Sequence, residues 1–332
     1  MEKLVETTDS MNTTHSTEGI TLPHDLPAQP DSDQVPFDHL SESPSMLKMY
    51  LKILKPRSGL KEGDSVPKYG VECMMKISQD WLSAYTQICG WTSSDHDLVP
   101  ITAPQVLAAP LHMYLLTHQL FPSSALGVVH AENEMIAHKP IDPKLPLKVK
   151  SWIGGTHWKA RGFQVDMYTT VSQNDEEEPR WLAKTSLFRT AKTSQKSTHS
   201  SKTDQLINGD EQALQLSANM GRRYAPIAGD FNPIHLYPIT AKLFGFKRPI
   251  IHGMWTLAHL LSEVIPDLHQ LSCGRLAVRF RRPLALPLKS TWRYQTTANT
   301  KFMQALDPRG KLAVDIAFEA KEISAATDAN EC

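Results

Sequence analysis

Residues 224–254 read YAPIAGDFNPIHLYPITAKLFGFKRPIIHGM, and the centre of this stretch is a turn that carries two ionisable side chains. Gly229 precedes Asp230, and an Asn-Pro pair at Asn232 separates Asp230 from His235. Glycine tolerates a positive φ, and the proline keeps the asparagine out of the helical region, so the chain should turn here. We therefore expect Asp230 and His235 to lie on a loop and to converge on one point.

A carboxylate beside an imidazole can hold and deprotonate a water molecule, or pass a proton to a neighbouring carbon. Downstream, His252 and Gly253 open an apolar segment that predicts a helix over about 249–265. The uncovered N–H of Gly253 at a helix start can donate to a carbonyl oxygen that gains charge during a reaction. His252 either supports this site or is a hydrogen-bonded histidine of the core.

The alternative for the turn is a purely structural one, because an isolated Asp-x-Asn-Pro string is common in turns and His235 could then be a turn histidine. The order of GDFNPIH, Ala241, Gly245-Phe246 and IIHGM at 250–254 favours the functional interpretation. This order resembles the MaoC-like, hydratase 2 family of (R)-specific enoyl-CoA hydratases and dehydratases, which have the hot dog fold. The close match covers about 30 residues, and residues 210–323 follow the family's strand order loosely.

The resemblance implies roles for individual residues. Asp230 and His235 match the catalytic pair that holds the water added across a trans-2-enoyl thioester, and Gly253 matches the glycine whose N–H polarises the thioester carbonyl. Asn232 matches the asparagine that shapes the substrate site, and we expect His252 beside it. Ala228 departs from the family, which often has a small hydroxyl residue there; this removes a hydrogen-bonding group near the site but neither catalytic side chain.

The rest of the chain repeats one order of elements. In each half a helix, over 105–119 or 249–265, precedes several segments rich in β-branched and aromatic residues. Tyr85-Thr-Gln-Ile-Cys-Gly90 also matches Tyr224-Ala-Pro-Ile-Ala-Gly229 in spacing. We therefore predict an α+β double hot dog, in which two antiparallel sheets each wrap around a long central helix.

The predicted boundaries follow composition shifts. The polar composition of residues 1–42 predicts a disordered tail. The Ser/Thr/Lys-rich stretch 191–210 indicates a linker. Between them, 43–190 form the N-terminal hot dog domain, and 211–325 form the C-terminal catalytic domain.

The N-terminal half lacks the residues that form the predicted catalytic site. The alignment of the two tyrosines places Trp91 opposite Asp230 and His96 opposite His235, so no carboxylate occupies the acid position. Ala108-Ala109-Pro110 stands where the other half has His-Gly-Met. By analogy with the family, this half supplies the pocket wall for the acyl chain, and each chain has one active site.

Basic residues around 275–289 are the candidates for the phosphates of coenzyme A. The alternation of a strand places Arg279 and Arg281 on the face opposite Leu276 and Val278. We name Arg279 and Arg281 as substrate-binding residues, although a solvated outer face explains them too. No metal site is expected, since His112, His118, His130 and His138 have no acidic or Cys partner at ligand spacing. Without a GxGxxG or P-loop string, coenzyme A, as part of the substrate, is the only cofactor predicted.

Composition limits the class of protein. The 332 residues carry 35 Lys+Arg and 35 Asp+Glu, which gives no overall attraction to nucleic acid or to an anionic membrane. Four scattered cysteines without a CxxC pair argue against a disulfide framework and fit a reducing compartment. No spanning segment or secretory signal is visible, so we expect a cytoplasmic protein with no membrane partner. By family analogy, two such chains pair into a homodimer.

The predicted function is the reversible syn hydration of trans-2-enoyl-CoA to (3R)-3-hydroxyacyl-CoA by the Asp/His pair. A dehydratase of other β-hydroxyacyl thioesters, including those on an acyl carrier protein, is an open alternative. A non-catalytic subunit that binds acyl thioesters is the other, because a fold alone does not fix function.

Overall fold

The computed structural model describes residues 20–28, 35–53, 57–92, 97–195 and 204–321. In the N-terminal half the strands are β1 (Phe37–Leu40), β2 (Gly70–Met75), β3 (Val128–Ala137), β4 (Leu147–Lys159), β5 (Gly162–Ser172) and β6 (Trp181–Thr190). Its helices are α1 (Met46–Ile53), α2 (Gln79–Cys89), α3 (Ala103–Leu107) and α4 (Ala109–Thr117).

The C-terminal half repeats this order. Its strands are β7 (Asp210–Leu216), β8 (Gly274–Phe280), β9 (Leu288–Thr297), β10 (Thr300–Leu306) and β11 (Leu312–Ala320). Its helices are α5 (Met220–Ala228), α6 (Pro238–Leu243) and α7 (Gly253–Val264), with short 3-10 turns at Pro233–His235 and Leu268–Leu271.

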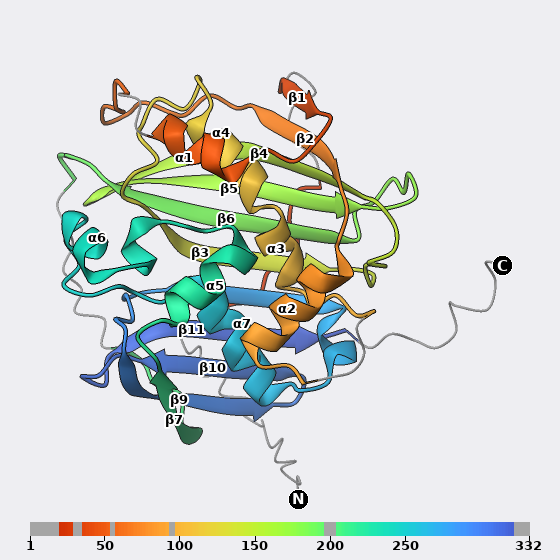
Figure 1. Ribbon diagram of the computed structural model, residues 1–332, viewed down its shortest axis with the longest axis vertical. Helices are drawn as coiled ribbons and strands as arrows, with labels where there is room; N and C mark the ends of the chain where they lie inside the picture. Colours follow the sequence, from red (N-terminus) through yellow and green to blue (C-terminus); the bar gives the residue numbers. More distant parts are fainter. Residues whose placement is uncertain (1–19, 29–34, 54–56, 93–96, 196–203, 322–332) are drawn as a thin grey trace, which may run out of the picture.

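The two halves have the same sheet topology, which confirms the double hot dog fold. The strand order is β2-β4-β5-β6-β3 in the first half and β7-β9-β10-β11-β8 in the second. In both halves the helices lie on one face of the sheet (Figure 1). The matched motifs also occupy matching places, because α2 ends at Gly90 and α5 ends at Gly229, each with a positive φ.

The two predicted antiparallel sheets are present as half-sheets that join edge to edge. Strands β3 and β8 pair antiparallel, with Asn133 opposite Val278 and Ala137 opposite Gly274. The described residues therefore form one sheet of 11 strands, and a single hydrophobic core cluster extends through both halves. The two unpaired edges of the half-sheets satisfy each other's backbone groups in this way.

Hydrogen bonds between helices fix the halves together on the inner side of the sheet. The indole N–H of Trp255 donates to the carbonyl of Ile88 over 2.9 Å, and that of Trp81 donates to Ile227 over 2.8 Å. Each tryptophan thus satisfies a carbonyl near the end of a helix in the other half. The loop after α5, which contains Asp230, is anchored by these contacts.

The central helix predicted for the N-terminal half over 105–119 is not continuous. It is divided at Ala108 into α3 and α4, and Pro110 lies in the first turn of α4. A proline has no N–H and clashes with the preceding turn, so it begins a helix and interrupts a longer one. The corresponding helix of the other half, α7, has no internal proline and is continuous over 12 residues.

The predicted disordered tail 1–42 is partly wrong, although residues 1–19 and 29–34 lie outside the described residues. Ile20 packs against Ala277 and Ala317 on the outer face of the sheet. Strand β1 pairs in parallel with β2, with Phe37 opposite Gly70. A few apolar residues are enough to order this polar stretch, because the sheet already presents small apolar side chains to cover.

Part of the predicted linker 191–210 is also packed. Its residues 196–203 lie outside the described part, but the N–H of Ile207 donates to Gln304 over 2.9 Å. Asp204 forms an ion pair with Arg282 at 2.9 Å. The described segment from 204 therefore lies on the C-terminal half before β7 begins. None of the helices within the described residues is long and apolar enough to cross a membrane.

Candidate active site

Asp230 lies directly after the end of α5, on the turn predicted from the sequence. Gly229 ends that helix with φ 65°, in the left-handed region that favours glycine. The side chain of Asn232 then accepts from the N–H of Ile234 over 3.3 Å and caps the 3-10 turn that carries His235. The side chain of Asn232 therefore holds the backbone of the loop, and its role in substrate binding stays a prediction.

The carboxylate of Asp230 faces two imidazoles. Its Oδ2 lies 3.8 Å from Nε2 of His235 and 3.9 Å from Nε2 of His252. The Asp230 side chain is 41% exposed, whereas those of His235 and His252 are 9% and 3% exposed. The structure thus brings together the two predicted catalytic side chains at a point that a substrate can reach from the Asp230 side.

His235 is held by its other nitrogen. Its Nδ1 lies 2.8 Å from the carbonyl oxygen of Ile250, which accepts the proton of that nitrogen. The other ring nitrogen, Nε2, faces Asp230. The 3.8 Å separation of Nε2 and Oδ2 is too long for a direct hydrogen bond, and a water placed beside both atoms could hydrogen bond to each.

His252 packs against the ring of His235 and holds the backbone of Asp230. Its ring stacks on that of His235, with centroids 3.8 Å apart, and its Nε2 donates to the backbone carbonyl of Asp230 over 3.0 Å. The prediction that His252 binds substrate is not supported, because the side chain is covered by His235. Burial, with His235 next to it, lowers the pKa of His252 to about 3 although Asp230 opposes this, so the imidazole is neutral.

A residue that the sequence analysis missed completes the site. The hydroxyl of Tyr50, on α1 of the N-terminal half, donates to Oδ1 of Asp230 over 3.1 Å. Burial and the carboxylate raise the pKa of Tyr50 far above its ordinary value, so the phenol remains a donor. No motif marks this tyrosine, and nothing in the spacing of residues 50 and 230 suggests that they meet.

The electrostatics of Asp230 favour the ionised form. Burial raises the pKa of its carboxyl, whereas His235 and His252 lower it. The backbone N–H of Asn232 and the hydroxyl of Tyr50 lower it further, and the net pKa lies below the ordinary aspartate value. Asp230 is therefore a charged acceptor at neutral pH.

Gly253 begins α7, as predicted, and no side chain among the described residues caps this helix start. A Cβ at this position would lie 2.8 Å from the ring of Phe280, so a larger residue does not fit. His252 precedes Gly253 directly, so the N–H of Gly253 opens next to the imidazoles. A helix N-terminus of this kind stabilises a carbonyl oxygen that becomes negative.

The predicted phosphate-binding residues Arg279 and Arg281 are not brought to this site. Arg279 lies on the outer face of the sheet, 3.9 Å from Glu132, and Arg281 lies 3.2 Å from Asp315. Phe280, between them, points to the inner face and packs against the start of α7. The alternation was predicted correctly, and these ion pairs favour the alternative of a solvated outer face over phosphate binding.

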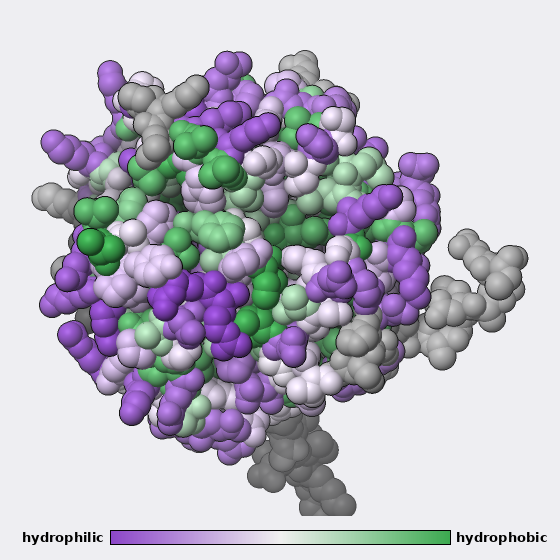
Figure 2. Space-filling model, in the orientation of Figure 1, coloured by the Kyte–Doolittle hydropathy of each residue, from purple (hydrophilic) through white to green (hydrophobic). Residues whose placement is uncertain are grey.

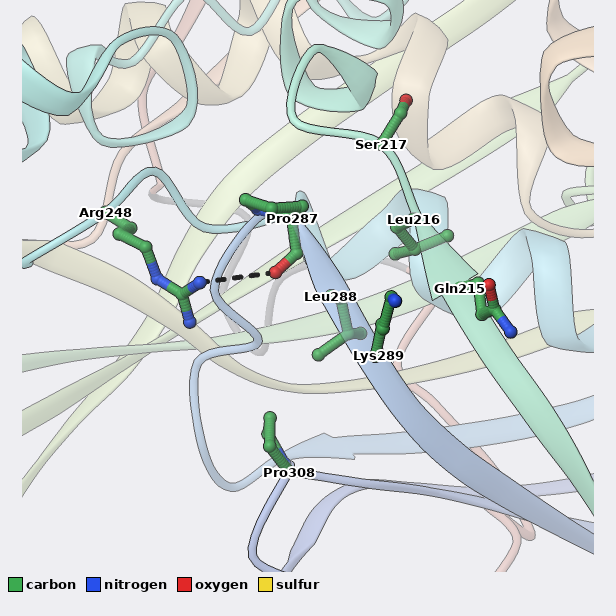
Figure 3. A pocket seen from close by; sticks show the side chains of 8 residues that line it. All are labelled: Gln215, Leu216, Ser217, Arg248, Pro287, Leu288, Lys289 and Pro308. Atoms are coloured by element: carbon green, nitrogen blue, oxygen red, sulfur yellow. Dashed lines mark hydrogen bonds between the residues drawn. The ribbon is translucent and has the colours of Figure 1, made fainter.

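A pocket of about 540 Å³ lies beside the segment that leads into α7 (Figure 3). Arg248 and Lys289 contribute charge to its walls. Ser217 and Pro287 also line it. Arg248 donates to the carbonyl of Pro287 over 3.5 Å and lies two residues before Ile250, whose carbonyl holds His235. The segment that lines the pocket at Arg248 thus continues into the site at Ile250, although Asp230 does not line the pocket.

The same three side chains could also ligate a metal ion. One ligand atom of each of Asp230, His235 and His252 lies within 4.8 Å of the others. The hydrogen bonds argue against this use, because Nε2 of His252 donates its proton to the Asp230 carbonyl and so presents no lone pair to a cation. The arrangement fits a bound water better than a cation.

The N-terminal half has no equivalent site among its described residues. Trp91, aligned with Asp230, is buried and donates its indole N–H to the carbonyl of Ile265 over 3.1 Å. His96 lies outside the described residues. A core tryptophan thus takes the place of the carboxylate.

Known proteins that are similar to this chain belong to the family that the motif resembles. The family model described as "MaoC like domain" matches residues 201–306. The chain is 33% identical over 211 residues to "3-hydroxyacyl-thioester dehydratase X" of Mycobacterium tuberculosis, covering 62% of this chain and 72% of that protein. It is 32% identical over 78 residues to the "(R)-specific enoyl-CoA hydratase" of Aeromonas caviae, covering 23% of this chain and 58% of that one.

Among solved structures, the crystal structure of HtdX of Mycobacterium tuberculosis superposes with a TM-score of 0.64 at 26% identity. The match covers 77% of this chain and all of HtdX. Because it is 33% identical, over 211 aligned residues, to a relative of which it covers 72%, the chain belongs to the MaoC-like dehydratase family.

Proposed function

We propose that the protein hydrates trans-2-enoyl-CoA to (3R)-3-hydroxyacyl-CoA and catalyses the reverse dehydration. The observation that carries this proposal is that Asp230 Oδ2 and His235 Nε2 lie 3.8 Å apart and face each other, so that one water beside both atoms could hydrogen bond to each. Membership in a family of acyl-thioester hydratases and dehydratases supports the reaction class.

In the hydration direction, Asp230 accepts a proton from the water as its oxygen bonds to C3 of the enoyl group. Asp230 and His235 then return one proton to C2, delivered from Nε2 of His235. One water is thus added to the substrate, and the two side chains gain and lose no proton overall. Both groups lie on the same side of the substrate, and the addition is therefore syn. The N–H of Gly253 donates to the thioester oxygen, which carries negative charge while the C2 proton is in transit.

Arg248 and Lys289 replace Arg279 and Arg281 as our candidates for the phosphates of coenzyme A. They flank the pocket next to the catalytic loop, and neither is committed to a carboxylate by a contact in the described structure. Exposed cations near a site raise the local concentration of an anionic substrate even without direct contact.

A carrier-protein thioester is the second candidate, and one observation favours it. Exposed apolar side chains gather on α1, on α6 and in the loop that leads to α6: Leu47, Leu51, Phe231, Tyr237, Ile239 and Leu243. Figure 2 shows apolar side chains over both helices. Lys52 and Lys242 lie among them, and no acidic residue lies in either helix. Such a surface suits an acidic protein partner.

The test follows the absorbance of the conjugated enoyl thioester with crotonyl-CoA and with longer enoyl-CoAs, and determines the configuration of the product. We expect loss of absorbance and a 3R product. The same acyl chain presented on coenzyme A and on a carrier protein separates the two candidates by kcat/KM. Binding without turnover on either carrier would contradict both and would indicate a binding subunit.

A cytoplasmic location and a homodimer remain part of this proposal. Cys73, Cys89 and Cys273 are free, buried thiols, which suits a reducing compartment. Sedimentation analysis of the purified chain tests the dimer.

A further inference from the structure

The inner face of the N-terminal half-sheet carries polar side chains in the place expected for the acyl chain. They come from four strands and from the two central helices, and each is at most 8% exposed: Gln105, His112, Asn133, Ser151, Thr169 and Thr185. On the strands of the C-terminal half, the side chains that face the core are apolar: Val278, Trp292, Met303, Ala305, Val314 and Ile316. An acyl pocket for a plain hydrocarbon would need apolar residues here too.

Three of these residues form one hydrogen-bonded cluster in which two oxygens lack a donor. The amide nitrogens of Gln105 and Asn133 both donate to the hydroxyl of Thr185, over 2.9 and 3.2 Å. Gln105 Oε1 and Asn133 Oδ1 then have no partner among the described residues, although the side chains are only 4% and 1% exposed. Leaving a buried carbonyl oxygen without a donor is costly, so a donor from outside the described chain is expected here.

The orientation of the Asn133 amide is fixed by His130. Burial lowers the pKa of His130 to about 4, so its imidazole is neutral, and one ring nitrogen donates to the backbone of Glu132. The other nitrogen, Nε2, must then accept, and the amide nitrogen of Asn133 lies 3.2 Å from it. The oxygen of Asn133 is therefore the free end of the amide.

This cluster is connected to the reaction site by a short series of contacts. The ring of His130 meets that of Phe280 edge to face, with centroids 5.0 Å apart. Phe280 in turn packs against the backbone of Gly253 at the start of α7. Asp230 is also close enough to oppose the lowering of the His130 pKa. An acyl chain that extends from the thioester at Gly253 into the N-terminal half would thus pass along His130 toward the two free oxygens.

We propose that Gln105 and Asn133 form a subsite for a hydroxylated acyl chain, in which a hydroxyl of the substrate donates to Gln105 Oε1 or Asn133 Oδ1. This inference rests on the proposed function and names its substrate class. A hydroxyl supplies the donor that the cluster lacks, whereas a methylene displaces any water and leaves both oxygens unpaired. A site built to hydrogen-bond a substrate hydroxyl rejects the analogue without it.

The test compares kcat/KM for trans-2-dodecenoyl-CoA with that for its analogues bearing one hydroxyl at C6, C8, C10 or C12. We expect at least one analogue to exceed the parent chain by about tenfold or more, which corresponds to one hydrogen bond to a buried acceptor. The variants Asn133→Leu and Gln105→Met should remove that preference, so that the ratio of kcat/KM between the analogue and the parent chain falls to about one. Ser151→Ala is the matched control, since Ser151 is hydrogen bonded to Thr169 in the same interior and should not affect the preference.

Equal or better turnover of the parent chain relative to every analogue would overturn the proposal and would leave the two oxygens to bound water. This comparison uses the unaltered protein and so does not depend on the folding of a variant. Crotonyl-CoA, too short to reach the N-terminal half, reports on the proposed function separately. If crotonyl-CoA is not hydrated either, calorimetry with dodecanoyl-CoA and its hydroxylated analogues measures the same preference as a ratio of Kd values, and equal values would overturn it.

Discussion

The hydroxyl of Tyr50 donates to Oδ1 of Asp230 over 3.1 Å and so joins the N-terminal half of the chain to the reacting group of the C-terminal half. The backbone N–H of Asn232 donates to the same oxygen over 3.1 Å. Since Oδ1 is held by these two donors, Oδ2 is the oxygen that faces His235 and His252. Tyr50 is therefore a positioning residue for the carboxylate.

Replacing this hydroxyl should lower the activity and shift its pH dependence. Tyr50→Phe loses a hydrogen bond to a charged group, for which we expect a fall in kcat/KM of about 10- to 100-fold. The hydrogen bond lowers the pKa of Asp230, so its loss raises that pKa and moves the acid limb of the kcat/KM profile to higher pH. Enoyl-CoA hydration measured between pH 4 and 8 tests both effects.

Tyr114→Phe is the matched control, because the hydroxyl of Tyr114 donates to the carboxylate of Asp38 over 2.9 Å, away from the site. It should leave both the rate and the acid limb unchanged. If Tyr50→Phe behaves in the same way, Tyr50 does not position Asp230.

Three buried histidines should make the fold sensitive to acid. Burial lowers the pKa of His112 and His252 to about 3 and that of His130 to about 4, so all three stay neutral in the folded chain. The unfolded chain protonates them near pH 6.5, and the unfolded state binds more protons below that pH. The free energy of unfolding should fall with decreasing pH by about 1.4 kcal/mol per pH unit for each such histidine until the folded pKa is reached.

Urea unfolding at pH 7, 6 and 5 measures this slope. His112→Gln should reduce this slope by about 1.4 kcal/mol per pH unit. His39→Gln should leave the slope unchanged, since His39 is 74% exposed. A free energy of unfolding that is constant from pH 7 to 5 would contradict the neutral, buried state of these imidazoles.

Arg248 and Arg279 should differ in their effect on substrate binding. Arg248 lies at the pocket beside the catalytic loop, whereas Arg279 lies on the outer face next to Glu132. For a coenzyme A substrate, Arg248→Ala should raise KM by about 3- to 10-fold, with the effect reduced by salt, because an exposed cation acts through a screened field. Arg279→Ala should leave KM within about twofold of the unaltered protein. A larger effect at Arg279 would restore the outer face as the phosphate site.

Chelation should not affect the reaction, although the site could be mistaken for a metal centre. Nε2 of His252 donates to the Asp230 carbonyl, so a cation would have to displace that hydrogen bond. We expect full activity after dialysis against EDTA, and inhibition by added Zn²⁺, which would occupy Asp230 and His235 in place of the water. Loss of activity with EDTA and its recovery with Zn²⁺ would instead assign Asp230, His235 and His252 as ligands.

The sequence predicted the local parts of this site well, because they depend on residues close in the chain. Gly229 ends α5, Asn232 caps the turn before His235, and Gly253 begins α7, all as local backbone preferences require. The equivalence of the two halves was also predictable, since matched letters such as Tyr85 and Tyr224 lie on the matched helices α2 and α5.

The contacts between distant segments were not predictable from spacing. Tyr50 meets Asp230 across 180 positions, and its helix α1 has no motif that marks a catalytic partner. For Arg279 and Arg281, alternation gave the correct face of the strand but could not tell which face α7 covers. Ile20 and β1 are ordered by a sheet surface that exists only after the whole chain has folded. The polar cluster at Gln105 and Asn133 likewise needs β3, β6 and α3 in place.

The hydration rate of Asp230→Asn tests the central claim most directly, since asparagine keeps the size of the side chain and removes its ability to take a proton. We expect kcat for a trans-2-enoyl-CoA to fall by about 10²- to 10⁴-fold, with circular dichroism and the unfolding midpoint close to those of the unaltered protein. Asp38→Asn, a carboxylate with a similar tyrosine partner outside the site, should retain full activity. An unchanged rate in Asp230→Asn would contradict the assignment of Asp230 as the base that activates water.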